Sequence, residues 1–311
     1  MILDLFIYFF SFLFIWYGSG LIIGSIDRLA HRFKISSFAA SFFVLGILTS
    51  LPEATIGVNA VIEAEPEIFV GNLIGASLVL FVLVIPILAV FGNGVTLNHQ
   101  LNEKNLFLSL IIVAAPIFFI IDQKITRYEG LFLIILYLVL FYMIEKRKGL
   151  IERIHDEIIY GKGQVFRDIG KIIVGILIVF VSSGFIVDKT RSFSQTLGIS
   201  SYIVSLLFLS IGTNLPELSL AIRAINMGKK NVALGDYIGS AAANTLIFGL
   251  LTFFYGKTIT VTNHFLLTLI FIVLGFGLFF LFSRSKNDIS RREGTALLFL
   301  YLLFLITEIV I

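Results

Sequence analysis

Long apolar runs alternate with short polar connections along the whole chain, and this pattern predicts membrane-spanning helices. A helix needs about 20 predominantly apolar residues to cross the hydrocarbon core of a bilayer. Runs of roughly this length lie at residues 2–26, 37–62, 69–91, 105–121, 128–144, 169–187, 200–227, 231–255, 260–282 and 294–311. We therefore expect an all-α integral membrane protein with about ten transmembrane helices.

The runs fall into two groups of five, separated by one long polar connection. Residues 145–168, EKRKGLIERIHDEIIYGKGQVFRD, are charged and partly amphipathic, whereas the other connections are shorter. This pattern predicts a first five-helix repeat at 1–144, a connecting loop at 145–168 and a second five-helix repeat at 169–311.

The distribution of basic residues predicts the orientation of the chain. When the connections are assigned alternately to the two sides, one side receives most of the 23 Lys and Arg residues, together with the 145–168 loop. Because Lys and Arg accumulate in cytoplasmic loops, we expect this side to face the cytoplasm and both termini to lie outside a plasma membrane. The basic residues assigned to the outer side are Lys124, Arg127, Lys189, Arg191 and Lys257.

The composition supports the membrane class and excludes several kinds of site. Hydrophobic residues make up 58% of the chain and charged residues only 14%, whereas about 25% of the residues in a soluble protein are charged. The sequence has no cysteine, which excludes disulfides, thiolate metal sites and cysteine nucleophiles. The pattern of charges gives no indication of nucleic-acid binding.

Two near-identical pentapeptides reveal an internal repeat. TSLPE at Thr49–Glu53 lies within the second apolar run, and TNLPE at Thr213–Glu217 lies 164 positions later within the seventh. The same shift, without a gap, aligns GNLIG at Gly71–Gly75 with GDYIG at Gly235–Gly239. Aligned Pro and Glu residues are rare inside hydrophobic runs, so we interpret the chain as a tandem duplication.

The number of helices in each half predicts the symmetry. Each half carries an odd number of helices, so the second copy enters the membrane from the opposite side. This is the inverted-repeat arrangement of many secondary transporters.

Each pentapeptide is expected to break a helix. Pro52 and Pro216 lack an N–H group, so the carbonyls of Leu48 and Gly212 should lose their helical partners. Broken backbone is tolerated at membrane depth only where protein buries it or a wet cavity lines it. We therefore expect a cation or water to interact with the freed carbonyl oxygens.

The breaks also concentrate hard oxygen ligands. An unpaired carboxylate near the bilayer centre costs roughly 2.5–3.5 kcal/mol on insertion scales, and no Lys, Arg or His lies at residues 48–58 or 212–222 to pair with Glu53 or Glu217. Carboxylates, hydroxyls, amides and free carbonyls together suit Ca²⁺ or Na⁺, and poorly suit zinc. The neighbouring polar side chains are Thr49, Ser50, Thr213 and Asn214.

With these motifs, the sequence resembles the calcium/cation antiporter superfamily, which includes the sodium/calcium and proton/calcium exchangers. The paired motifs are G-[ST]-[SN]-LPE and G-[ND]-x-I-G-[SA], and the resemblance covers essentially the whole chain. It implies a secondary active antiporter that exchanges Ca²⁺ for Na⁺ or H⁺ by alternating access. Helices two, three, seven and eight would form the ion site, and helices one and six would slide across them.

The resemblance also implies the partners and the ligands. The substrates would be inorganic cations in a lipid bilayer, with no cofactor and no catalytic residues, and we expect a single chain to suffice for transport. Glu53 and Glu217 match the principal cation-binding glutamates of the family. The remaining ligand positions match Thr49, Ser50, Thr213 and Asn214 beside them, and Ser240 and Asn244 on helix eight.

Asp236 is a further candidate ligand with two readings. It lies one turn before Ser240 and two turns before Asn244, on a shared helix face. Its partner in the first repeat, Asn72, lies at the predicted start of a helix, so capping or a place in a cytoplasmic vestibule competes with ion ligation.

Three departures from the family pattern bear on the coupling ion. Helix three has Ala76 and Leu80 where the sodium/calcium exchangers carry Ser and Asn, and helix eight has Asn244 where they commonly carry Asp. In addition, Leu48 replaces the leading Gly of the first motif. Fewer oxygen ligands bring a three-sodium stoichiometry into question. Two glutamates balance one Ca²⁺ and could instead take two protons, so both Na⁺ and H⁺ coupling remain open.

Other classes of function are less consistent with the sequence. A cation channel would more often show an oligomeric filter motif, and an intramembrane enzyme would need a Ser with His, an HExxH motif or an Asp pair. None of these appears in the central segments. An antiporter for other cations and protons remains an alternative, as does acid–base chemistry by the paired carboxylates.

Overall fold

A computed structural model shows a bundle of helices. It describes residues 2–32, 46–97, 103–148, 162–215, 217–218, 222, 231–232, 234–261, 265–285 and 288–310. Within these ranges, each apolar run predicted to span the membrane contains a helix or a broken helix. The prediction of an all-α membrane protein is confirmed.

In the first half, the helices follow the five predicted runs. They are α1 (Ile2–Arg32), α3 (Gly46–Thr49), α4 (Leu51–Ile62), α5 (Pro66–Val79), the π-helix η2 (Leu80–Val84), α6 (Ile85–Phe91), α7 (Glu103–Phe118) and α8 (Arg127–Lys148).

The second half follows the same plan. Its helices are α9 (Lys162–Leu197), α10 (Ser201–Val204), the π-helix η3 (Ser205–Leu209), α11 (Ser210–Thr213), α13 (Leu234–Tyr255), α14 (Phe265–Ser285) and α15 (Arg291–Val310). Helices α8 and α9 extend into both ends of the predicted 145–168 loop, whose residues 149–161 lie outside the described part of the chain.

The membrane-crossing capacity of the helices agrees with this plan. Within the described ranges, six helices are long and apolar enough to span a bilayer, and they include α1, α9 and the continuous α5–η2–α6 segment. The segments at the two pentapeptides, α4 and α10–η3–α11, are shorter apolar helices, because each run is interrupted at its break.

Short strands record the inverted symmetry of the two halves. Strand β1 (Val95–Leu97) lies between β3 (Asn231–Val232) and β5 (Asp288–Ile289), and β2 (Lys124–Ile125) pairs with β4 (Ile259–Thr260). A shift of 164 positions converts β1 into β4 and β2 into β5.

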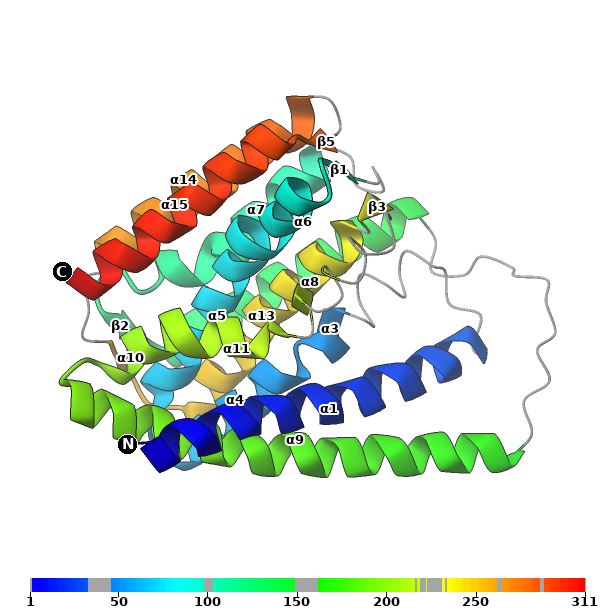
Figure 1. Cartoon of the computed structure of the whole chain (residues 1–311), viewed down its shortest axis with the longest axis vertical. Coiled ribbons are helices and arrows are strands. Elements are labelled where there is room, and N and C mark those ends of the chain that lie inside the picture. The colour runs from blue at the N-terminus through cyan, green and yellow to red at the C-terminus, as the bar shows by residue number, and fades with distance from the viewer. Residues whose placement is uncertain are drawn as a thin grey trace.

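The register of these strands obeys the same shift. Val95 pairs with Ile289 in the antiparallel β1–β5 ladder, and their equivalents Ile259 and Ile125 pair in the antiparallel β4–β2 ladder. The two sheets lie at opposite ends of the helices (Figure 1). At both ends of the bundle, a strand of the first half therefore pairs with strands of the second half.

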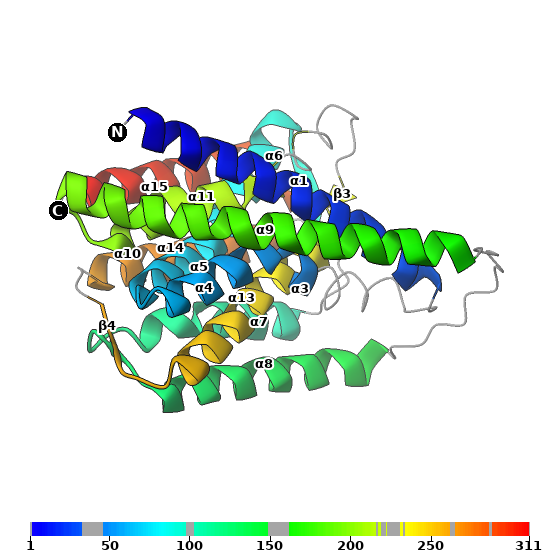
Figure 2. The ribbon, with the colours of Figure 1, turned by 90° about the horizontal axis from the view of Figure 1, so that it is seen from below.

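The first helices of the two repeats form a pair along one side of the molecule. Helices α1 and α9 lie side by side over most of their length, with α14 and α15 on the opposite side of Figure 1. Figure 2 shows the same pair side by side, with α4 next to α9. The broken helices and α5 and α13 thus form the centre of the bundle.

Small residues allow the central helices to approach closely. A Cβ atom placed on Gly75 of α5 would lie 2.7 Å from the Cβ and Oγ atoms of Ser210, and one placed on Gly46 would lie 2.8 Å from the carbonyl oxygen of Gly239. The 164-position shift converts Gly75 into Gly239 and Gly46 into Ser210, so these are two copies of one contact. Gly75 and Gly239 thus act as the small residues that let membrane helices pack closely.

Candidate cation site

The two helix breaks have the same backbone geometry. Ser50, between α3 and α4, has φ −85° and ψ 9°, and Asn214, after α11, has φ −88° and ψ 10°. Both values leave the helical region for a single residue. Helical hydrogen bonding resumes at once, because the N–H of Ala54 donates to the Ser50 carbonyl and that of Leu218 donates to the Asn214 carbonyl, each over 3.0 Å.

The prediction about freed carbonyls holds only in modified form. The Gly212 carbonyl accepts from the N–H group of Asn214, so it gains a local partner in place of its helical one. Pro216 itself lies outside the described residues.

The two glutamates are buried at these breaks. Glu53 is 2% exposed and Glu217 is 5% exposed. The carboxylate of Glu53 is close enough to interact electrostatically with Glu217. The Oε2 atoms of both glutamates have no hydrogen-bond partner within the described part of the chain.

Ser50 links the first break to α13, which is the eighth predicted helix. Its hydroxyl lies 3.1 Å from the carbonyl oxygen and 3.2 Å from the hydroxyl of Ser240, and both serines are buried. Thr49, which is partly buried, donates to the Gly46 carbonyl over 3.2 Å. The structure therefore brings Ser50 and Ser240 together, whereas Thr49 bonds within its own helix.

The hydrogen bonds at the second break differ from those at the first because the sequences of the two repeats have diverged. The symmetry equivalent of the Ser50–Ser240 pair is Asn214 with Ala76, and alanine offers no polar group. Accordingly, the Asn214 amide donates over 2.7 Å to the Ser210 carbonyl of its own helix. Thr213, which is fully buried, has its hydroxyl 3.4 Å from the Oδ1 atom of Asn72 and 3.3 Å from the Ser210 carbonyl.

Helix α13 contributes the side-chain amide of Asn244, which has no hydrogen-bond partner among the described residues. Asn244 of α13 is buried, and neither its oxygen nor its nitrogen has a hydrogen-bond partner among the described residues. Such an orphaned side chain in a membrane protein indicates a place for a ligand or water. Asp236 lies near the start of α13, but its side chain is outside the described residues, so its role remains a prediction.

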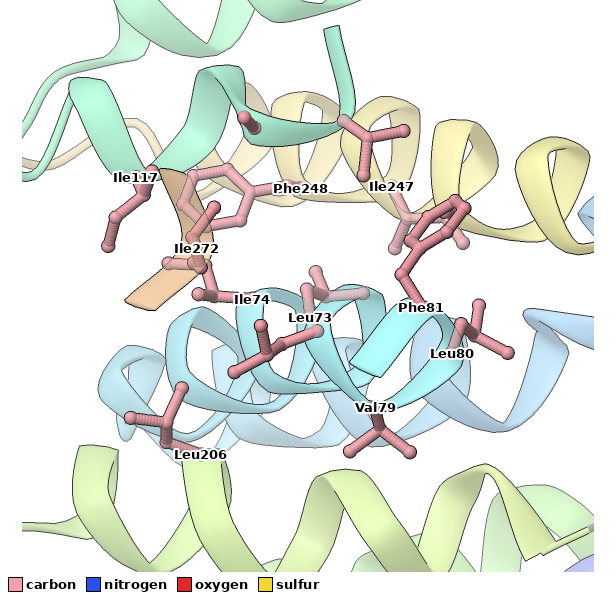
Figure 3. Close-up of a cluster of buried hydrophobic side chains, with 14 of the residues drawn as sticks. Leu73, Ile74, Val79, Leu80, Phe81, Ile117, Leu206, Ile247, Phe248 and Ile272 are labelled. Atoms are coloured by element: carbon pink, nitrogen blue, oxygen red, sulfur yellow. The ribbon is translucent and has the colours of Figure 1, made fainter. Parts of the chain in front are cut away.

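One wall of the central region is apolar, as predicted from Ala76 and Leu80 on the third predicted helix, which is the α5–η2–α6 segment. Leu80 is fully buried, and Figure 3 places it beside Phe81, which points toward Ile247 of α13. Ala76 lies one turn earlier on the same helix and is also buried. These positions supply no oxygen ligand.

An aromatic side chain of α1 covers the second break. The ring of Phe12 lies against Gly212, close enough that a Cβ atom on the glycine would overlap it. In the first repeat, position 48 is leucine instead of glycine. The glycine of the second motif therefore makes room for α1 beside Thr213.

The structure adds Asn72 to the residues selected from the sequence. We expected Asn72 at a helix start, which left capping open as a role for its repeat partner Asp236. The expected position of Asn72 is wrong, because α5 begins at Pro66 and Asn72 is buried well inside it. The repeat alignment with Asp236 was the signal that could have identified it.

The chain matches known proteins along nearly its whole length. The sequence model of the family described as sodium/calcium exchanger protein matches residues 3–144 and 168–310. The sodium/calcium exchanger MaX1 of Methanosarcina acetivorans is 22% identical over 331 residues, which cover 93% of each chain.

Solved exchanger structures share the fold. The sodium-calcium exchanger NCX_Mj is 25% identical, covers 97% of each chain and superposes with a TM-score of 0.66. The H⁺/Ca²⁺ exchanger CAX is 16% identical, covers 98% of this chain and 86% of its own, and superposes with a TM-score of 0.76. The second likeness concerns the fold alone.

Proposed function

The chain belongs to the sodium/calcium exchanger protein family, whose matched relatives are secondary transporters and not enzymes, and on this premise we propose that it exchanges Ca²⁺ for Na⁺ or H⁺ by alternating access. Glu53 and Glu217 are the principal cation ligands in this proposal. Thr49, Ser50, Thr213, Asn214, Ser240, Asn244 and Asp236 complete the candidate ligand set.

One observation carries the proposal. Two buried carboxylates come from symmetry-equivalent helix breaks, lie close together and each keep an oxygen without a hydrogen-bond partner in the described structure. Buried charges are otherwise paired or bound to metal. One Ca²⁺ would neutralise both carboxylates, and carboxylate, hydroxyl and carbonyl oxygens are the ligands that Ca²⁺ prefers.

The broken helices add backbone ligands of the same kind. Helices α3 and α11 end at Thr49 and Thr213, so their negative dipole ends and last carbonyls lie beside the carboxylates. Half-helix ends of this type coordinate cations in secondary transporters. Charge and dipole thus favour the same ligand.

The orientation belongs to the proposal as well. We place both termini outside the cell membrane and the 145–168 connection in the cytoplasm, because most basic residues lie on that side. A single chain contains both glutamates, and its own two halves complete the proposed site.

Ion flux in proteoliposomes tests the function. We expect ⁴⁵Ca²⁺ uptake when an outward gradient of the coupling ion is imposed, and no uptake without a counter-ion. Separate sodium and proton gradients identify the coupling ion. Calcium passage that needs neither gradient would indicate a channel, and the absence of calcium flux under every gradient would contradict the proposal.

The apolar wall predicts how sodium dependence can be increased. The double variant Leu80→Asn with Asn244→Asp introduces an oxygen ligand on η2 and a third carboxylate on α13. We expect a higher sodium dependence of ⁴⁵Ca²⁺ uptake, because several Na⁺ ions then find ligands together. Unchanged sodium dependence in a folded and active double variant would show that these positions do not set ion choice.

A further inference from the structure

Asn72 lies on the face of α5 that has lost its other polar side chains. Residues 72, 76 and 80 are spaced by four and so share one helix face. Two of them are Ala76 and Leu80, whereas Asn72 is polar and 0% exposed. Asn72 is therefore the polar member of this stripe, and it contacts the second break through Thr213.

The hydrogen-bond donors and acceptors around Asn72 are not all paired in this arrangement. The Thr213 hydroxyl has one hydrogen, yet two acceptors lie within reach: Asn72 Oδ1 and the Ser210 carbonyl. Meanwhile the Nδ2 atom of Asn72 is buried without any partner in the described structure. A buried donor without an acceptor is destabilising.

Turning the Asn72 amide by half a revolution removes the imbalance. The oxygen and nitrogen of an asparagine amide are assigned from the hydrogen-bond network. After the turn, Nδ2 donates to a lone pair of the Thr213 hydroxyl, and Thr213 keeps its hydrogen for the Ser210 carbonyl. The Oδ1 atom of Asn72 then takes the buried position of the former Nδ2 atom, which has no partner in the described structure.

We propose that this Oδ1 atom is a ligand of the transported cation, and this inference rests on the function proposed above. The amide oxygen is a neutral hard ligand, which Ca²⁺ accepts alongside carboxylates. It leaves the balance of two carboxylates against one Ca²⁺ unchanged. Asn72 thus supplies from α5 an oxygen that Ala76 and Leu80 do not.

A double-mutant cycle separates a ligand from a residue that only supports Thr213. We would measure Ca²⁺ affinity by calorimetry in detergent for the wild type, Asn72→Leu, Thr213→Val and the double variant. Asn72→Leu keeps the side chain similar in size and removes both polar atoms. We expect it to weaken Ca²⁺ binding about tenfold, as for loss of one contact to a charged group, both in the wild-type background and in the Thr213→Val background.

The opposite result is equally clear. If Asn72 acts only by holding Thr213, the leucine substitution has no further effect once the hydroxyl is gone, and the proposal is overturned. Asn105→Leu on α7 is the matched control, because Asn105 is also buried and lies outside the proposed ligand set. Its Ca²⁺ affinity should equal that of the wild type.

A second substitution covers the case in which Asn72→Leu does not fold. Asn72→Asp keeps the shape and adds an anionic oxygen, so at pH 8 we expect tighter Ca²⁺ binding. Unchanged or weaker binding would overturn the proposal. Failure of the wider function is distinguishable: a wild type without Ca²⁺ affinity refutes both, whereas loss of binding in Glu53→Gln with normal binding in the Asn72 variants refutes this inference alone.

Discussion

Replacing either Glu53 or Glu217 by glutamine is expected to abolish Ca²⁺ exchange while leaving the helix bundle folded. Each substitution keeps the shape of the side chain and removes one negative charge from a buried pair. Bound Ca²⁺ then loses one of its two anionic partners. Removing one partner of a buried pair of opposite charges costs roughly 3–5 kcal/mol, which corresponds to about two to four orders of magnitude in Ca²⁺ affinity. Uptake of ⁴⁵Ca²⁺ into proteoliposomes measures the loss directly.

The control for this experiment is a glutamate far from the breaks. Glu103 is exposed at the start of α7 and pairs with Arg284 over 3.1 Å. Surface pairs of this kind contribute about 0–1 kcal/mol, so Glu103→Gln should transport normally. Near-normal transport in both the Glu53 and the Glu217 variants would remove the basis for assigning them as cation ligands.

A single methyl group on Gly75 is expected to disrupt the packing of the central helices. The added Cβ atom would meet the backbone oxygen of Leu206 and lie 2.7 Å from the Ser210 side chain. Backbone atoms cannot move aside as a flexible side chain does, and overpacking in a close-packed interior costs typically about 1–3 kcal/mol. We expect Gly75→Ala to lower the thermal stability and to reduce transport, since α5 and α11 carry residues of the proposed site.

Gly277→Ala provides the matched comparison. Gly277 lies inside α14, and nothing lies within 4 Å of the position its Cβ atom would take. Alanine is about 1 kcal/mol more favourable than glycine inside a helix, so this variant should be as stable as the wild type or more so. The recovery of monodisperse protein after heating, measured by size-exclusion chromatography, compares the two. Equal stability of both variants would show that the α5–α11 contact tolerates expansion.

The apolar pattern was sufficient to predict the helices, since the bilayer imposes a length and a polarity on every span. The chain outside the membrane has no such constraint, and the predicted 145–168 loop accordingly turned out to include the ends of α8 and α9. The repeat was also visible in the sequence. The 164-position shift found from TSLPE and TNLPE reappears in the strand registers and in the matching dihedral angles of Ser50 and Asn214.

The partners of the polar side chains could not be predicted in the same way. Whether Asn214 pairs across the interface or within its own helix depends on Ala76, a residue far away in the sequence. Asn72 was placed at a helix start because a single apolar run does not show where its helix begins. Its actual place, buried against Thr213, follows from the packing of α5 on α11.

By itself, the sequence determined the membrane class, the duplication, the inverted symmetry and the two glutamates at the helix breaks. Each of these follows from a local or periodic property: apolar length, an odd helix count, or a proline beside a carboxylate. Tertiary structure alone decided that the two carboxylates lie together, that Ser50 bonds Ser240 and that Phe12 covers Gly212. These contacts join residues from different helices, and they depend on how closely small residues allow those helices to pack.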